Sequence, residues 1–192
     1  MKNSLHKYLT EQTHLTRDEV EMVLNSFRVV VLKQNDFWIQ RGEICKQLAF
    51  VDKGILRIIN EINEVESTVQ LIFENSFTTS LTSFAYQTKS EWEIQALTDC
   101  KLLVIDRDAH LELINEYKNW LEVDNVLLLL AYTDLEYRLF SQHNLSAEQR
   151  FNKLFSEKPE IFNKIPLKYI ASALSIAPET LSRLRKKHLI NS

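Results

Sequence analysis

The sequence is poor in glycine, proline and cysteine, and it has no long hydrophobic run. Only 2 Gly, 3 Pro and 2 Cys occur in 192 residues, which argues against long flexible linkers and against a disulfide framework. The most apolar stretch, 126–131, is flanked by Asp124 and Asp134 and is much shorter than the roughly 20 residues that a membrane helix needs. The N-terminus lacks the apolar segment of a signal peptide. We expect a globular, cytoplasmic protein without a membrane partner.

Patterns that indicate catalysis or cofactor binding are also missing. The sequence has no glycine-rich phosphate loop and no motif around a nucleophilic serine or cysteine. Cys45 and Cys100 are too few for an iron–sulfur cluster, which needs about four cysteines. The five histidines lie outside the stretch with strand signals, where a metal-binding barrel would place them. We expect no catalytic site, no metal and no cofactor, and an enzyme of the cupin type is the weakest alternative.

Charge is distributed unevenly along the chain. The net charge is −3, yet residues 150–192 carry nine Lys and Arg against three Asp and Glu, while residues 1–149 carry fourteen against twenty-three. An acidic body with a basic C-terminal part predicts a polyanionic partner for that part. A solvated basic helix without a partner is the alternative that charge alone leaves open.

The period of the hydrophobic pattern changes from helix to strand and back. Thr16 and Glu19 form a capping-box signature before a helix that reaches Phe27. Short β-branched or aromatic segments follow until residue 105, and their regular spacing predicts an α+β protein with a double-stranded β-helix, that is, a jelly-roll-like β-roll. The expected strands are 29–32, 48–51, 55–59, 67–73 and 102–105, with turns at 40–43, 52–54 and 60–64.

A short helix is expected from Asp106, and a long helix from about 118 to 143. The long helix is apolar almost all round, which predicts that more than one of its sides is covered. One side can lie on the β-roll. The other is expected to pair with a second copy of the chain, although burial within a monomer is the alternative. The residues expected at the dimer contact are Trp120, Val123, Leu127, Leu130 and Tyr137.

The segment 166–187 has the pattern of two short helices joined by a tight turn. Pro166 suits the first turn of the first helix, and Ala171 is small enough for the place where the helices touch. Residues 175–177 interrupt the helical period, and Pro178 opens the second helix. This spacing predicts a helix-turn-helix that binds double-stranded DNA, with an ordinary helical hairpin as the alternative.

The second helix of this pair exposes polar and cationic side chains. Arg183 can make a bidentate contact to guanine, and Glu179 can accept a hydrogen bond from a cytosine amino group. The basic residues nearer the C-terminus suit phosphates. The expected DNA contacts are Pro178, Glu179, Thr180, Ser182, Arg183, Arg185, Lys186 and Lys187.

The order of these motifs resembles that of the Crp/Fnr family of transcription regulators over nearly the whole chain. The segments 41–43, 51–57 and 176–184 carry the resemblance, together with the long helix. It implies a cyclic-nucleotide-binding-like domain, a homodimer formed by the long helix, and RNA polymerase as a further partner. In the family's cyclic-AMP receptor an Arg, a Glu and an Arg read bases. Glu179 and Arg183 match the last two, whereas Pro178 replaces the first, so we expect a different DNA preference.

The resemblance also implies that the sensor lacks several of the residues that bind the nucleotide in relatives. Relatives hold the cyclic phosphate with a Gly-Glu pair and a later Arg, and the corresponding positions here are Thr79, Ser80 and Ser90. We expect an effector other than cyclic AMP, or none. An unknown small molecule could occupy a pocket in the roll, unless its side chains simply fill the roll. The expected pocket residues are Phe77, Thr79, Ser80, Leu81, Ser90, Trp92 and Leu128.

These expectations combine into one domain organisation. Residues 1–143 form the sensor with its dimer helix, and residues 146–192 form the DNA-binding domain, with an abbreviated wing because the sequence ends soon after the recognition helix. The expected function is transcription regulation by a homodimer on a near-palindromic site. The alternative is a small-molecule sensor or interaction module whose DNA-binding domain has decayed.

Overall fold

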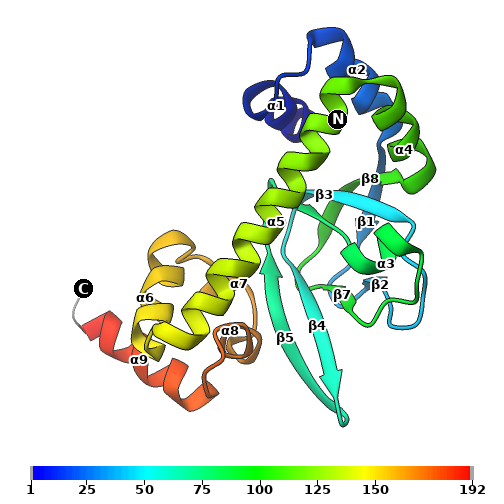
Figure 1. The fold of residues 1–192 in the computed structure, drawn as a ribbon. Coiled ribbons are helices and arrows are strands. Elements are labelled where there is room, and N and C mark those ends of the chain that lie inside the picture. Colours follow the sequence, from blue (N-terminus) through cyan, green and yellow to red (C-terminus); the bar gives the residue numbers. More distant parts are fainter. Residues whose placement is uncertain (1, 191–192) are drawn as a thin grey trace.

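Two four-stranded antiparallel sheets form a β-roll at the centre of the protein (Figure 1). The computed structural model describes residues 2–190. One sheet has the strand order β1-β8-β3-β6 and the other β2-β7-β4-β5. The strands are β1 (Arg28–Leu32), β2 (Phe37–Ile39), β3 (Gln47–Lys53), β4 (Leu56–Ile62), β5 (Val65–Ile72), β6 (Phe77–Thr78), β7 (Glu93–Ala96) and β8 (Cys100–Asp106).

Helices precede, interrupt and follow the roll. Figure 1 shows α5 running from the N-terminal helices, along the roll, to a cluster of short helices that ends the chain. The helices are α1 (Asn3–Gln12), α2 (Arg17–Ser26), α3 (Leu81–Tyr86), α4 (Arg107–Glu116), α5 (Lys118–Asn144), α6 (Ala147–Glu157), α7 (Ile161–Lys164), α8 (Leu167–Ala173) and α9 (Pro178–Ile190). None of the helices within residues 2–190 is both long and apolar enough to span a membrane.

The α+β class, the β-roll and the long helix are confirmed, and the five expected strands correspond to β1, β3, β4, β5 and β8. No sequence pattern predicted α1 or the strands β2, β6 and β7, which are two to four residues long. Strands this short carry too few residues for a period of two to be recognised. Their pairing partners, distant in sequence, define them instead.

The expected turn at 60–64 is shorter than predicted. Ile62 pairs with Val65, so the hairpin loop between β4 and β5 contains only Asn63 and Glu64. Both residues have positive φ, 52° and 64°, as the favoured two-residue hairpin turn requires. The strands therefore continue almost to the tip of the hairpin.

Local capping signals were reliable. Thr16 and Glu19 form the predicted capping box of α2, and Ser146 and Gln149 form a second one at the start of α6. Each box satisfies two backbone N–H groups that the first helical turn leaves free. The first turns of α2 and α6 depend on residues only three positions apart, so the sequence alone is enough to predict where these helices begin.

The central strand β8 is buried on both faces. Leu103 and Ile105 pack on the outer side against α1, α2 and the start of α5, whereas Leu102 and Val104 point into the roll. Successive side chains of a strand point to opposite faces, so a strand covered on both sides must be apolar throughout. This explains why 102–105 is an unbroken hydrophobic run.

The C-terminal helices share a hydrophobic core with the β-roll. Ile55 and Leu97 of the roll belong to the same buried cluster as Phe151, Ile161 and Phe162. Residues of one cluster are in side-chain contact. The C-terminal helices are thus packed directly on the outer side of the sheet that contains β4 and β5.

The two glycines differ in how much space surrounds their Cα atoms. Gly54 has φ +100°, and a Cβ atom there would lie 2.6 Å from Sγ of Cys100. Gly42 has φ +85°, but a Cβ atom there would meet nothing within 4 Å. We expect Gly54→Ala to lower the free energy of unfolding by about 2–4 kcal/mol and Gly42→Ala by about 1 kcal/mol, because only the first adds a clash to the strained φ. Urea denaturation measures both values, and equal losses would show that the contact with Cys100 has no energetic effect.

Candidate functional site

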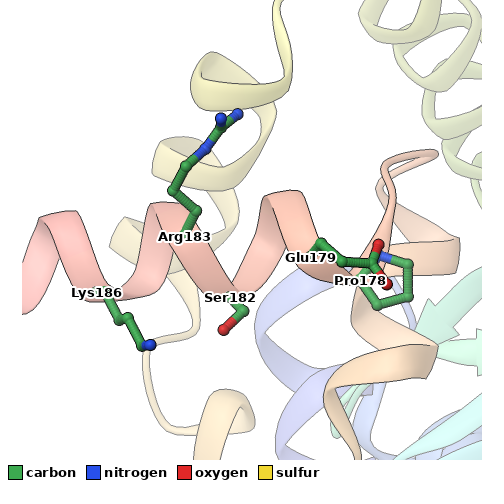
Figure 2. A pocket seen from close by; sticks show the side chains of 5 residues that line it. All are labelled: Pro178, Glu179, Ser182, Arg183 and Lys186. Carbon is green, nitrogen blue, oxygen red and sulfur yellow. The ribbon is translucent and has the colours of Figure 1, made fainter.

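An open groove of about 550 Å³ lies along the first half of α9. It is lined by Pro178, Glu179, Ser182, Arg183 and Lys186, which recur at steps that keep residues on neighbouring rows of a helix. Figure 2 shows these side chains extending from the helix, with Arg183 and Lys186 pointing in different directions. Glu179, Arg183 and Lys186 are exposed. The first half of α9 therefore presents two cations, one carboxylate and one hydroxyl to solvent.

The turn before α9 is tight and is held by backbone hydrogen bonds. Ser175 adopts a left-handed backbone with φ +53°, and the N–H of Ile176 donates to the carbonyl oxygen of Ala171 at 3.0 Å. Ala171 and Leu181 are completely buried, so the two helices touch where the sequence placed a small residue. Pro178 is the first residue of α9, as expected, whereas Pro166 lies one residue before α8 rather than in its first turn.

Arg150 of α6 holds the turn in place. Its guanidinium donates to the carbonyl oxygens of Leu174 (2.8 Å) and Ser175 (3.3 Å) and to that of Leu145 at the end of α5. Carbonyls at the ends of helices lack partners within the helix, so this cation caps α5 and α8 together. Arg150 thereby fixes the position of the α8–α9 pair relative to the long helix.

Three of the eight expected DNA contacts lie outside the groove. Arg185 donates to the side-chain oxygen of Asn163 at 2.7 Å, and Lys187 forms an ion pair with Glu148 at 2.7 Å. Thr180 is half-buried. The helical pattern predicted which residues face outward, but it contains no information on α6 and α7, the elements that supply these partners.

The expected effector residues do not gather around one cavity. Ser80 and Ser90 are both buried, and their hydroxyl oxygens are 2.8 Å apart. The Thr79 hydroxyl donates to the carbonyl of Gln47 at 2.8 Å. These three polar groups are therefore satisfied within the protein. These three side chains are part of the packed roll, and an effector pocket stays a prediction.

The four remaining residues of the expected pocket have separate surroundings. Phe77 packs against Tyr8 and Phe50, with ring centroids 5.6 and 5.1 Å away. The N–H of Trp92 bonds to the hydroxyl of Ser90. Leu81 and Leu128 are exposed, by 45% and 44%. Two of the four therefore belong to the packed roll and two to the surface.

Contacts that the sequence did not signal hold α3 against the roll. The Ser83 hydroxyl accepts from the N–H of Cys45 at 2.8 Å and donates to the carbonyl oxygen of Thr88. The Arg107 guanidinium donates to the carbonyl of Phe84 at 2.9 Å. Buried polar groups are costly unless they are paired, and these pairs join residues up to 38 positions apart. Such pairing depends on the tertiary fold and leaves no local motif.

A buried histidine connects α3 with the long helix. His110 of α4 lies 3.1 Å from the carboxylate of Asp124 in α5. Its ring lies edge-on between Phe84 of α3 and Trp120 of α5, with centroid distances of 5.6 and 5.9 Å. A movement of α3 would therefore press directly on side chains that contact α5.

The described residues contain no group of three or more His, Cys, Asp and Glu side chains that could hold a metal. Cys100 is buried under Gly54, and this burial raises the pKa of its thiol. Cys45 is buried as well. A buried thiol is inaccessible to substrates and metal ions, so both cysteines act here as small core residues.

The structure corrects the expected dimer face of α5. Trp120 and Val123 are buried in the protomer's own core with α1 and α2, and Leu127 packs against the same cluster. These residues are therefore already covered. Leu130 is exposed, and Tyr137 is partly covered by Lys153, whose ammonium lies 4.4 Å from the ring centroid. The helix is apolar all round, so its sequence alone does not show which side faces its own roll.

Residues 29–117 match the sequence profile of the cyclic nucleotide-binding domain family. No curated protein sequence matches the chain. The chain therefore carries a β-roll of the cyclic nucleotide-binding type, which the two antiparallel sheets and the short helix α3 also show.

Solved structures share the fold over nearly the whole chain. CLP, described as a c-di-GMP-responsive global regulator of Xanthomonas campestris, is 15% identical, with a TM-score of 0.71, and the match covers 92% of this chain and 93% of CLP. FixK2 from Bradyrhizobium japonicum is 11% identical, with a TM-score of 0.72 and coverages of 86% and 85%. The catabolite activator protein of Thermus thermophilus is 21% identical, with a TM-score of 0.57 and coverages of 93% and 85%.

We expect cyclic AMP not to bind this roll, because the Ser80–Ser90 pair offers neither a carboxylate for the ribose nor a cation for the phosphate. A ligand that binds only the native state raises the unfolding temperature, and at about 1 mM cyclic AMP we expect a shift below about 1 °C. Differential scanning fluorimetry and titration calorimetry measure this. Saturable binding with a dissociation constant in the micromolar range would contradict the expectation.

Proposed function

We propose that this protein is a DNA-binding transcription regulator of the Crp/Fnr type. The observation that carries the proposal is the exposed row on the first half of α9, formed by Pro178, Glu179, Ser182, Arg183 and Lys186. A helix-turn-helix places the N-terminal half of its second helix in the major groove, where side chains reach base edges. The tight turn between α8 and α9 and the basic C-terminal part support this interpretation.

The side chains of this row have distinct roles in the proposal. Arg183 reads guanine through its planar guanidinium, and Glu179 accepts from cytosine. Lys186 contacts a phosphate, and Ser182 adds a short hydrogen-bonding group. Pro178 has no side-chain donor, so the base opposite the start of α9 is read by shape alone.

The other expected contacts take a secondary role. Arg185 and Lys187 reach phosphates only after leaving Asn163 and Glu148. Thr180 is half-buried and contributes mainly to packing. We therefore place the main electrostatic contribution of α9 on Arg183 and Lys186.

The regulator acts as a homodimer in this proposal. Two α9 helices would enter successive major grooves about 34 Å apart on a near-palindromic site. In the proposal the chain divides functionally into a sensor with the dimer helix, 1–143, and a DNA-binding part, 146–192. RNA polymerase is a further partner in the proposal.

The sensor would respond to an effector other than cyclic AMP, or act without one. The hydroxyls of Ser80 and Ser90 are hydrogen-bonded to each other. They stand at the positions where relatives bind a nucleotide. CLP, which shares the fold, is described as responsive to cyclic di-GMP, so roll proteins of this kind are not limited to one ligand. A sensor or interaction module with a decayed DNA-binding part is the competing function, and direct DNA binding separates the two.

DNA selected from a random pool provides the site for the central test. We expect Arg183→Ala to weaken binding to that site by about 1–3 kcal/mol and to relax preference at one base pair. Lys186→Ala should weaken all sequences alike and reduce the slope of log K against log salt by about one. Fluorescence anisotropy at several salt concentrations measures both effects.

Lys187→Ala is the matched control, because it removes the same charge from the next position of α9, where an ion pair with Glu148 already engages it. We expect a smaller loss than for Lys186→Ala. If Arg183→Ala and Lys186→Ala both bind DNA as the parent does, α9 is not the recognition helix, and the competing function is favoured.

A further inference from the structure

One side of α5 exposes a heptad row, and Gln142 at its C-terminal end donates a hydrogen bond to Ser175 at 3.1 Å. We call this row the α5 seam. Its positions alternate by four and three residues, the spacing at which two helices interlock side chains. The α5 seam comprises Leu121, Asn125, Leu128, Tyr132, Leu135, Leu139 and Gln142, all of them exposed.

The α5 seam lies on a different side of the helix from the residues that the protomer itself buries. At 3.6 residues per turn, the centre of the seam is roughly 120° from the centre of the group Trp120, Val123 and Leu127. That group is already packed against α1 and α2. A single soluble chain rarely exposes so many large apolar side chains in one continuous row, and a row with heptad spacing is complementary to a second copy of itself.

Asn125 is a polar residue within the leucine-rich part of this row. It lies between Leu121 and Leu128, and in heptad terms Asn125, Tyr132 and Leu139 share one type of position. β-Branched residues at such positions favour two-stranded assembly, and α5 has none there. A single asparagine at such a position selects register and number of strands, at a cost in stability, because its amide needs a partner amide across the seam.

Charged residues beside the α5 seam are poorly placed to select the register of the dimer. Asp124 is engaged by His110 at 3.1 Å, and Arg138 by Asp134 at 3.1 Å, both within the protomer. Flanking charges often set partner orientation in coiled coils. Here two of them are committed to intramolecular pairs. Glu122 and Glu136 also flank the seam and are exposed, but they carry the same charge and cannot attract each other across it, which leaves Asn125 as the main polar determinant.

We propose that Asn125 fixes the register of a parallel α5–α5 homodimer by pairing with Asn125 of the second copy. This inference rests on the proposed function, because it specifies how the proposed dimer spaces its two α9 helices. A slip by one heptad would move one copy along the other by about 10 Å. That distance corresponds to about three base pairs of DNA, enough to separate the recognition helices from a pair of half-sites.

An antiparallel dimer is the competing arrangement of the same seam. In that arrangement Asn125 would face Leu135 or Gln142 of the other copy, depending on the register. The 27 residues of α5 span about 40 Å, so the two C-terminal parts would lie at opposite ends of the dimer. Two α9 helices so placed do not reach neighbouring major grooves on one face of a duplex, which is why we favour the parallel dimer.

Cysteine cross-linking tests the register directly. The native cysteines are buried, so a cysteine on α5 is the accessible thiol. In the parallel register, Asn125→Cys forms a disulfide-linked dimer under mild oxidation. Leu130→Cys is the control, because Leu130 is also exposed but lies on the side of the helix away from the seam, and it should cross-link far less. Cross-linking only in a double variant that combines Asn125→Cys with Leu135→Cys or with Gln142→Cys would establish the antiparallel dimer and overturn the proposal.

Asn125→Leu tests the specificity role. We expect its unfolding temperature to rise, because the apolar row becomes continuous, while light scattering detects species larger than a dimer. Affinity for the selected DNA site should fall at least about tenfold, as expected if the spacing of the recognition helices is lost. If the variant remains a dimer with the parent's DNA affinity, Asn125 does not set the register.

The parent protein separates this inference from the proposed function. A parent that is dimeric and binds DNA, combined with an Asn125→Leu variant that behaves identically, overturns only the role of Asn125. A monomeric parent overturns the proposed homodimer and the inference with it. A dimeric parent that cross-links through Asn125→Cys but binds no DNA supports the register and contradicts the proposed function.

Discussion

The constraint on which the structure depends is that α5 is apolar on almost every side and must be covered on each of them. Its N-terminal part satisfies this requirement on one side, where Trp120 and Val123 complete the core between α1, α2 and the outer face of the β1-β8-β3-β6 sheet. On another side, along the α5 seam, Leu121, Leu128, Leu135 and Leu139 are exposed. A single helix is thus part of the protomer's core on one side and an exposed apolar surface on another. The α5 seam is therefore fixed rigidly to the roll that would sense an effector.

The C-terminal helices are anchored to the same roll by polar and apolar contacts together. The hydroxyl of Ser172 in α8 accepts from the N–H of Thr68 in β5 at 2.8 Å, which satisfies a donor on the edge strand of the β2-β7-β4-β5 sheet. Nearby, the buried guanidinium of Arg57 lies 3.9 Å from the ring centroid of Tyr169 and donates to Gln95. A buried cation stacked on an aromatic ring and hydrogen-bonded on its edge makes a directional contact. The orientation of α9 is consequently tied to the strands of the roll as well as to α5.

The sequence predicted the features that depend on neighbouring residues, and it missed those that depend on distant partners. The capping box of Thr16 and Glu19 and the start of α9 at Pro178 are local, and both were placed correctly. The two-residue strand β6 exists only because Ala49 and Phe50 pair with it. The covered face of α5 depends on α1, a helix that the pattern did not reveal. In the candidate DNA site the outward row of α9 followed from helical spacing, whereas the partners of Arg185 and Lys187 come from α7 and α6.

The β-roll and the C-terminal helices are connected through α5, and this limits how a change in one could reach the other. Phe84 of α3 contacts the ring of His110, which in turn touches Trp120 and Asp124 of α5. A ligand changes an equilibrium only if it binds two states differently, so an effector acting here would have to displace α3 from its serine contacts. Ser80 and Ser83 already bond within the roll, and these bonds would have to break first. The arrangement of α3 in this structure is therefore stabilised by hydrogen bonds within the chain.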